Sequence, residues 1–325
     1  MSYSLDRRAF LRASVLAAGA GLVRTGHAMQ APQATPDRSF PIIDSHQHLW
    51  DLKRFNLPWL ANAPQSINHT FNVKDFQAAT AGLNVDKTIY MEVDVHPAQQ
   101  VQEAEFAIGL CEDSKNAVSG AVIGGYPHEK GFAEYLKRFA AVPCVKGVRT
   151  VLHAVDRPPG LCLNREFVDS MKRLGDAGLT FDLCMRPDEL LSAAQLAAKC
   201  PDTTFVLDHC GNIGLAAADA SLRQVWCEGV RAAAAQTNIV CKISGLIDKA
   251  GGVEWNSASL ADNVNFCLDA FGEDRVLFGG DWPVCLLGGS YLRWVDALEA
   301  IVADRPEDFR TKLFRGNAIR VYRLA

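Results

Sequence analysis

The sequence lacks the short motifs that mark several large enzyme classes. It has no GxGxxG or GxxxxGK[ST] turn, which argues against the usual dinucleotide- and nucleotide-binding loops. It has no Gly-x-Ser-x-Gly segment, which argues against a serine hydrolase with a nucleophile elbow. Its ten cysteines form no CxxC pair and no short Cys/His cluster, so zinc-ribbon and thioredoxin-like spacings are absent.

The sequence also has no large excess of positive or negative charge. The formal net charge is −4 over 325 residues, so the chain offers no strongly basic surface to nucleic acid or anionic lipid. Hydrophobic residues make up 49% of the sequence, which suffices for one large core, but no apolar run is long enough to span a bilayer. We therefore expect no nucleic-acid partner and no stable membrane span. The sequence is compatible with a monomer or an oligomer.

The N-terminus has the composition of an export signal. The order RRAFL at positions 7–11 precedes an apolar run over residues 13–23, and a small-x-small site ends at Ala28. This order is typical of a twin-arginine signal, which exports folded proteins to the periplasm. We expect residues 1–28 to be this signal and residues 29–39 to be a linker. A surface helix and an uncleaved signal are the alternatives. Scattered free thiols agree with folding in a reducing cytosol before export.

Residues 40–325 alternate between apolar strands and amphipathic helices. Eight β-branched, apolar runs predict strands at 41–48, 87–95, 118–127, 145–153, 179–187, 203–211, 239–247 and 275–283. Apolar spacing of i, i+3, i+4 and i+7 predicts helices at 130–142, 164–178, 187–200, 221–236 and 291–304. Eight such units predict an α/β protein with one closed (β/α)8 TIM barrel. An open doubly wound sheet is the alternative, and the missing glycine-rich turn weakens it.

Two long segments interrupt this alternation. Residues 49–72 follow the first strand and are rich in Trp, Pro and Asn, and residues 248–262 follow the seventh strand. In a barrel both segments lie on the C-terminal face, where active sites are built. We expect the first of them to form part of a lid.

Polar side chains gather at the C-terminal ends of the predicted strands. His46 and His48 end the first strand, and residues i and i+2 of a strand point to one face. The other strand ends carry Glu92, Asp94, Arg149, His153, Arg186, Asp208, His209 and Asp281. Each residue alone has a structural explanation, such as an aspartate that caps a loop. Together they bring three histidines and a carboxylate to one end of one barrel, which predicts a site.

These residue types suit the hydrolysis of an acyl compound. A carboxylate beside histidines or metal-bound water can act as general base. A histidine or a metal can polarise a carbonyl oxygen, and arginines can hold a carboxylate or vicinal oxygens of a substrate. The set favours attack of water on an ester, lactone or amide carbonyl.

The chain resembles a known family in six segments that occur in order. The amidohydrolase-related lactonases (amidohydrolase 2) include L-fuconolactonases, L-rhamnonolactonases, sulfomuconolactone hydrolases and pyrone-dicarboxylate lactonases. The segments are IIDSHQHLWD, KGVRT, FDLCMRPDEL, FVLDHCGN, VLFGGDWPV and FRGNAIRVYRL. The resemblance covers residues 40–325. It implies a distorted (β/α)8 barrel of the metal-dependent hydrolase superfamily and hydrolysis of a cyclic ester.

The resemblance also implies roles for individual residues. His46 and His48 match the histidine pair of the first strand, His209 matches the histidine of the sixth, and Asp281 matches the aspartate that activates water. Many superfamily members carry a bridging lysine or a metal-binding histidine after the fifth strand. This chain has CMRP there, at 184–187, which argues against a two-metal site. The family implies one divalent metal, Zn or Mn, or none. The ligands expected for a metal are His46, His48 and Asp281, completed by Glu92 or His209.

The function expected from the sequence is the opening of a neutral sugar-acid lactone, with Asp281 as general base and His209 polarising the carbonyl. The substrate-binding residues expected are Arg149, Arg186, His153, Trp50 and Trp282. A decarboxylase, an amide or imide hydrolase on the same scaffold, and a non-catalytic sugar-acid-binding protein are the alternatives. The hydrolase hypothesis requires Asp281 to lie within about 10 Å of all three histidine rings, so that one water can serve them.

Overall fold

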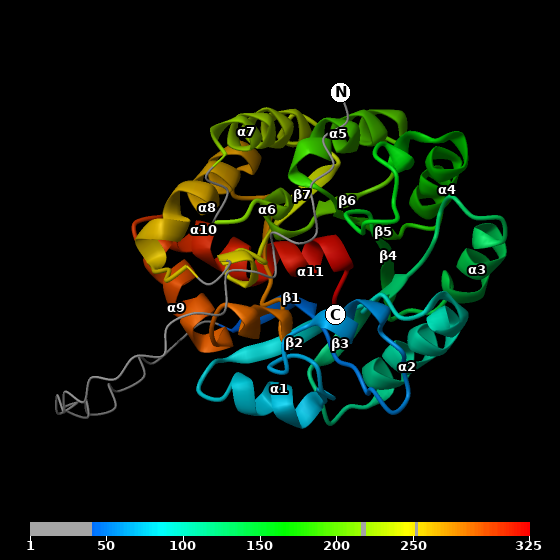
Figure 1. The fold of residues 1–325 in the computed structure, drawn as a ribbon, viewed down its shortest axis with the longest axis horizontal. Helices are drawn as coiled ribbons and strands as arrows, with labels where there is room; N and C mark the ends of the chain where they lie inside the picture. Colours follow the sequence, from blue (N-terminus) through cyan, green and yellow to red (C-terminus); the bar gives the residue numbers. More distant parts are fainter. Residues whose placement is uncertain (1–40, 216–218, 251–252) are drawn as a thin grey trace, which may run out of the picture. The chain divides into compact units, whose positions relative to one another are not determined.

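The computed structural model describes residues 41–215, 219–250 and 253–325, so the predicted signal and linker lie outside the described residues. Eight parallel strands form one sheet in chain order (Figure 1). They are β1 (Ile42–Gln47), β2 (Val85–Met91), β3 (Val118–Gly124), β4 (Val145–Val151), β5 (Thr180–Cys184), β6 (Phe205–Leu207), β7 (Ile239–Ile243) and β8 (Val276–Phe278). The eight predicted strands are confirmed, although β6 and β8 are much shorter than predicted.

The sheet closes on itself just beyond the end of β8. The backbone N–H of Asp281 donates to the carbonyl oxygen of His46 at 2.8 Å, and the N–H of His48 donates to the carbonyl oxygen of Trp282 at 2.8 Å. Gln47 and Trp282 form a parallel bridge there. The predicted (β/α)8 barrel is therefore confirmed, and its closing hydrogen bonds lie at the candidate site.

Helices surround the barrel (Figure 1). They are α1 (Val73–Ala79), α2 (Gln100–Glu112), α3 (Phe132–Phe139), α4 (Arg165–Asp176), α5 (Leu190–Lys199), α6 (His209–Asn212), α7 (Ala220–Ala234), α8 (Ser257–Phe271), α9 (Tyr291–Ile301), α10 (Glu307–Thr311) and α11 (Asn317–Tyr322). The five predicted helices are confirmed as α3, α4, α5, α7 and α9. Side-chain caps begin several of them; the side chain of Asn164, for example, accepts from the N–H of Phe167 at the start of α4. No helix among the described residues combines the length and the apolar character that crossing a bilayer requires.

The last helix closes the N-terminal end of the barrel. Apolar side chains of the strands point inward there and pack against α11. These side chains belong to Ile43, Ile89, Met91, Val122, Val206, Val240 and Leu277. Ala318, Val321 and Tyr322 supply the facing surface of α11, which crosses the middle of Figure 1 in red. Burying this apolar layer stabilises the barrel and leaves only its C-terminal end open to a ligand.

Turns and short helices connect the strands on the C-terminal side. Residues 49–72 contain the 3-10 helix η1 (Pro58–Asn62), and Trp50 pairs with Phe71 across the base of this loop. Residues 248–262 contain η5 (Asp248–Ala250) and the start of α8. The other short elements are η2 (Pro97–Gln99), η3 (Leu161–Leu163), η4 (Pro187–Glu189), η6 (Val284–Leu287) and the π-helical turn η7 (Lys312–Gly316).

Candidate active site

The structure brings the predicted histidines and aspartate together. Oδ1 of Asp281 lies 3.4 Å from Nε2 of His48 and 3.6 Å from Nε2 of His46, and Oδ2 lies 3.9 Å from Nδ1 of His209. His46 lies in β1 and His48 directly follows it, whereas His209 and Asp281 lie in the turns after β6 and β8. The distances are well inside the limit of about 10 Å that a shared water requires.

Asp281 is held in place by its backbone. It has a left-handed conformation, with φ of 54°, and its N–H is fixed by the hydrogen bond to His46 across the barrel closure. The side chain is buried. Burial raises the pKa of Asp281 to about 7, and the charge of Asp208 adds to this rise, whereas Lys249 and Arg149 oppose it. A carboxyl with this pKa exchanges a proton readily near neutral pH.

The three imidazoles are neutral and fixed by hydrogen bonds. Nδ1 of His48 lies 3.0 Å from the carbonyl oxygen of Met91, and Nδ1 of His209 lies 2.9 Å from Oγ of Ser244. Burial and then the charge of Arg149 lower the pKa of His48 to about 4. Burial also holds the pKa of His46 and of His209 well below the usual range. Neutral rings can bind a metal, or can donate one hydrogen bond and accept another.

A buried ion cluster lies inside the barrel beneath the histidines. Nζ of Lys242 lies 2.5 Å from Oδ2 of Asp182 and 3.2 Å from Oδ1 of Asp208. The same Asp208 oxygen lies 3.4 Å from Nδ1 of His46. The cluster therefore supports the ring of His46 from below. Sequence reasoning did not assign Asp182 or Lys242, although a lysine within the apolar run IVCKI was a usable signal.

Arg149 lies in this buried layer and pairs with Glu92. Nε of Arg149 donates to Oε1 of Glu92 at 2.6 Å, and its Nη1 lies 3.1 Å from Nε2 of His46. The other carboxylate oxygen of Glu92 accepts from the N–H of Asp94 at 2.6 Å. Both oxygens of Glu92, a predicted metal ligand, are thus engaged by protein donors.

A cavity of about 320 Å³ opens above Asp281. Predicted site residues on its wall are His48, Arg149, His153, His209 and Asp281. Its wall also includes Asp94, which the sequence placed at a strand end without a specific role. Trp59, Asp248 and Lys249 line the wall as well, and sequence reasoning did not assign them to the site. The long segments after β1 and β7 supply Trp59, Asp248 and Lys249, so both segments reach the cavity, as expected.

Three predicted substrate-binding residues lie elsewhere. Trp50 and Trp282 are buried in the hydrophobic core, and both contact the ring of Phe71. Arg186 pairs with Glu189 at 2.7 Å, and its side chain donates to backbone carbonyls of the loop after β4. None of the three lines the cavity. Trp59 is the aromatic residue of the loop that does, since its Nε1 donates to the carbonyl oxygen of Val93 at the rim.

The cavity wall carries two further acids and a cation. Asp94 has a left-handed backbone, with φ of 50°, and burial together with the charge of Glu92 raises its pKa to about 7. Nζ of Lys249 lies 3.2 Å from Oδ2 of Asp248. Burial opposes the charge of Lys249, but Asp248 and Asp281 outweigh burial and leave the pKa of Lys249 raised. Lys249 therefore presents a positive charge to the cavity.

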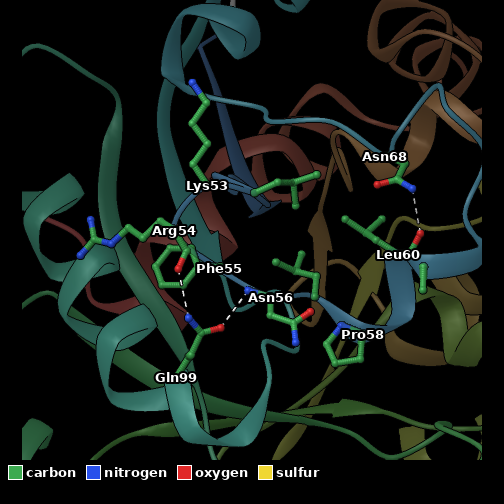
Figure 2. A pocket seen from close by; sticks show the side chains of 11 residues that line it. Lys53, Arg54, Phe55, Asn56, Pro58, Leu60, Asn68 and Gln99 are labelled. Atoms are coloured by element: carbon green, nitrogen blue, oxygen red, sulfur yellow. Dashed lines mark hydrogen bonds between the residues drawn. The ribbon is translucent and has the colours of Figure 1, made fainter.

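A second cavity of about 490 Å³ lies within the segment after β1 (Figure 2). Gln99 joins this segment to the loop after β2, since it accepts from the N–H of Asn56 at 2.8 Å and donates to the carbonyl oxygen of Arg54 at 3.0 Å. No catalytic candidate lines this cavity. Its hydrogen bonds fix the loop that carries Trp59.

The site has donors that suit one divalent metal. Ligand atoms of His46, His209 and Asp281 lie within 4.8 Å of one another. Neutral imidazoles and a carboxylate are the donors that Zn and Mn accept. The guanidinium of Arg149, however, faces the His46 nitrogen that would bind the metal. The donor set fits a metal, and Arg149 competes with that metal for His46.

Comparisons with known proteins agree on the fold and on the family. The model of the Amidohydrolase family matches residues 43–324. An L-fucono-1,5-lactonase of Burkholderia multivorans is 27% identical over 306 residues, which cover 87% of this chain and 96% of that protein. An L-rhamnono-gamma-lactonase of Scheffersomyces stipitis is 24% identical over 337 residues, covering 88% of this chain and 99% of that protein.

A crystal structure of an amidohydrolase from Burkholderia multivorans with bound Zn has the same fold. Its TM-score is 0.77 at 24% sequence identity, and the match covers 88% of this chain and all of that chain.

Proposed function

Because the chain belongs to the amidohydrolase family, we propose that it is a hydrolase that opens a small lactone, with a lactone of a sugar acid as its substrate class. Relatives named as L-fucono-1,5-lactonase and L-rhamnono-gamma-lactonase, matched over nearly their whole length, support this substrate class. The volume of the cavity, about 320 Å³, is ample for one small sugar ring.

The observation that carries the proposal is the position of Asp281. Its carboxyl lies at the base of the cavity, within 4 Å of a nitrogen of each of three imidazoles. A base that is held beside hydrogen-bonding rings can orient a water and accept its proton. The pKa of about 7 for Asp281 supports this role, because a general base works best when its pKa lies near the working pH.

The proposed reaction proceeds in two steps. Asp281 takes a proton from water while the water oxygen bonds to the lactone carbonyl carbon, which gives a tetrahedral oxyanion. The bond from this carbon to the ring oxygen then breaks, and Asp281 returns its proton to the departing ring oxygen. The product is a hydroxy acid. His48 and His209 orient the water, and the positive charge of Lys249 stabilises the oxyanion and then the product carboxylate.

The wall of the cavity orients the substrate in this proposal. His153 and Asp94 offer hydrogen-bonding groups to ring hydroxyls, and Trp59 offers an aromatic face to the ring. A divalent metal at His46, His209 and Asp281 would, when bound, polarise the carbonyl and lower the pKa of water. Arg149 and the metal would then compete for Nε2 of His46.

We propose further that the chain is exported to the periplasm by its twin-arginine segment, RRAFL at 7–11. Fractionation of cells that express the full chain tests this address. The protein should appear in the periplasm of cells with a working twin-arginine pathway, and Arg7→Lys/Arg8→Lys should hold it in the cytoplasm. Periplasmic recovery of that double variant at the level of the unchanged chain would contradict the proposal.

A panel of five- and six-membered sugar-acid lactones, read by proton release with a pH indicator, tests the activity. We expect turnover of at least one lactone and a fall in kcat/KM of about 10²–10⁴-fold in Asp281→Asn. Asp304→Asn, a change of an exposed aspartate, is the control and should match the unchanged protein. CO2 release from aromatic acids would favour a decarboxylase, and tight lactone binding without turnover would favour a binding protein. Full activity of Asp281→Asn would contradict the mechanism.

A further inference from the structure

Three thiols meet outside the barrel, and none of them lines the cavity. Cys210 lies in α6, Cys241 lies in β7, and Cys267 lies in α8, and all three are fully buried. Their Sγ atoms lie within 4.8 Å of one another. None of them takes part in a disulfide. The three residues are far apart in sequence, so the fold alone brings them together.

The backbone determines where these thiols point. Side chains of neighbouring residues in a strand face opposite ways, so Cys241 points away from the barrel interior that Lys242 occupies. Cys210 has a left-handed backbone, with φ of 52°, and its carbonyl oxygen accepts from Nε1 of Trp226 at 2.7 Å. Helix α8 packs on β7 and places Cys267 beside Cys210 and Cys241.

We propose that Cys210, Cys241 and Cys267 bind one soft, thiophilic metal cation, with Cu(I) as its representative. Thiolates are the protein ligands that Cu(I) prefers. For a metal–sulfur distance of about 2.3 Å, a planar three-sulfur site needs sulfur atoms about 4.0 Å apart. All three sulfur–sulfur separations are below 4.8 Å, so reaching the spacing of about 4.0 Å changes each of them by less than about 1 Å.

The number of donors favours Cu(I) over Zn. Structural Zn sites are closed by four protein ligands. The group found among the described residues holds three thiols, and the polar partners of Cys210 and Cys241 include the carbonyl oxygen of Lys242, at 3.7 and 3.8 Å. Three sulfur donors complete the coordination of Cu(I), which does not need a fourth ligand.

A bound cation offsets part of the charge that the thiols acquire when they ionise. A buried thiolate is costly unless a cation lies beside it. Binding replaces S–H bonds by metal–sulfur bonds and releases the thiol protons to solvent, and the copper remains Cu(I) throughout. No oxidant or reductant is needed.

The test is an anaerobic titration of the reduced, full-length protein with Cu(I) in competition with a chromophoric Cu(I) chelator. We expect one tightly bound Cu(I) per chain, with ultraviolet absorption from thiolate-to-metal charge transfer. Mutation of a residue that only hydrogen-bonds to a metal ligand lowers metal affinity about 10–100-fold. Cys267→Ala removes a ligand itself, so we expect the affinity for Cu(I) to fall about a hundredfold or more. Cys162→Ala, which removes a buried thiol outside the cluster, is the matched control and should bind as the unchanged protein does.

Two further measurements keep the result interpretable. Circular dichroism and thermal unfolding show whether Cys267→Ala folds, and Cys267→Ser serves as a second variant of similar size. X-ray absorption at the copper edge should show three sulfur neighbours. Equal Cu(I) affinity in Cys267→Ala and the unchanged protein, nitrogen neighbours at the copper, or failure to hold Cu(I) against the chelator would each overturn the proposal.

Discussion

The hydroxyl of Tyr322, in the last helix of the chain, lies 3.3 Å from Oδ2 of Asp182 inside the barrel. The same carboxylate oxygen pairs with Lys242, and Lys242 and Asp208 contact the ring of His46. A continuous polar path therefore runs from α11 through the barrel interior to the candidate active site. Each group on this path is buried, so each depends on its partners.

Lys242 is expected to be essential for stability. Lys242→Met leaves the carboxylates of Asp182 and Asp208 without their shared cation, and breaking a buried ion pair costs about 3–5 kcal/mol. Denaturant unfolding monitored by circular dichroism measures this loss. The double variant Lys242→Met/Asp182→Asn should recover part of it, because one of the orphaned charges is then removed.

The matched control for Lys242 is Lys312→Met. Lys312 also pairs with several carboxylates, but those pairs lie at the surface and are screened by solvent. We expect little loss of stability there. A Lys242→Met variant as stable as Lys312→Met would show that the buried cluster does not support the barrel.

The activity should depend on pH through Asp281. In the proposed mechanism the carboxylate form of Asp281 is the base. Burial raises the pKa of Asp281 to about 7, so kcat/KM should rise tenfold per pH unit below about 7 and level off above it. Initial rates at low lactone concentration between pH 5 and 8 measure the profile, after subtraction of spontaneous hydrolysis.

Asp94 serves as the control for this assignment, because its pKa is also raised to about 7. Asp94→Asn should keep the break in the profile, even if the KM for the lactone rises. Loss of the break in Asp94→Asn would transfer the titration from Asp281 to Asp94.

The protein should lose stability in mild acid because of buried neutral histidines. Burial lowers the pKa of both His48 and His153 to about 4, whereas an unfolded chain has the ordinary histidine pKa of about 6.5. Above about pH 6.5 these neutral histidines make their full contribution to stability. Between pH 6.5 and 4 the unfolded chain binds more protons than the folded protein does, so this contribution is lost as the pH falls through 4. Unfolding curves at several pH values should show a shallower acid decline in His153→Gln. An unchanged slope would contradict this cause.

Trp59 should affect substrate affinity more than turnover. It lines the cavity from the loop after β1 and has no part in the proposed proton transfer. Trp59→Ala should therefore raise the KM for a lactone by about tenfold, which corresponds to a loss of about 1.4 kcal/mol of binding, with a smaller change in kcat. Trp59→Phe keeps an aromatic face and loses only the hydrogen bond to Val93, so it should retain most of the affinity. Equal KM values for all three proteins would remove Trp59 from the substrate site.

Arg149 should weaken metal binding at the site. Its guanidinium lies 3.1 Å from the His46 nitrogen, so Arg149→Met removes a positive charge beside the ion and should tighten Zn binding by about tenfold or more. Competition with a chromophoric Zn chelator measures the affinity. Arg186→Met, which changes an arginine outside the cavity, should leave it unchanged. Weaker Zn binding in Arg149→Met would contradict competition for His46.

The sequence was informative about the fold because hydrophobic periodicity records burial directly. Eight apolar runs sufficed to predict the barrel, and His46, His48, His209 and Asp281 were predicted to converge because parallel strands end at one face. The helices α1, α2, α6, α8, α10 and α11 were not predicted. The ends of the short strands β6 and β8 were overextended, because polar residues there lie in turns with positive φ, a conformation that strand alternation does not reveal.

The residues that line the cavity were harder to predict, since the lining depends on the direction of each side chain. Trp50 and Trp282 flank the site in sequence, yet they point into the core, whereas Trp59 points to the cavity. Lys242 and Asp182 were missed because a strand pattern does not show which face of a closed barrel holds an ion pair. Lys249 lies beyond β7 in a loop whose path no periodicity determines.

The floor of the barrel is supplied by α11, which follows all eight strands in the chain. During synthesis the strands therefore emerge before the helix that covers their inward-facing apolar side chains, and this layer stays open to water until α11 has been made. The polar path beneath His46 likewise cannot be completed before Tyr322 joins Asp182. We therefore expect the barrel interior to be the part of the fold that becomes fully packed last.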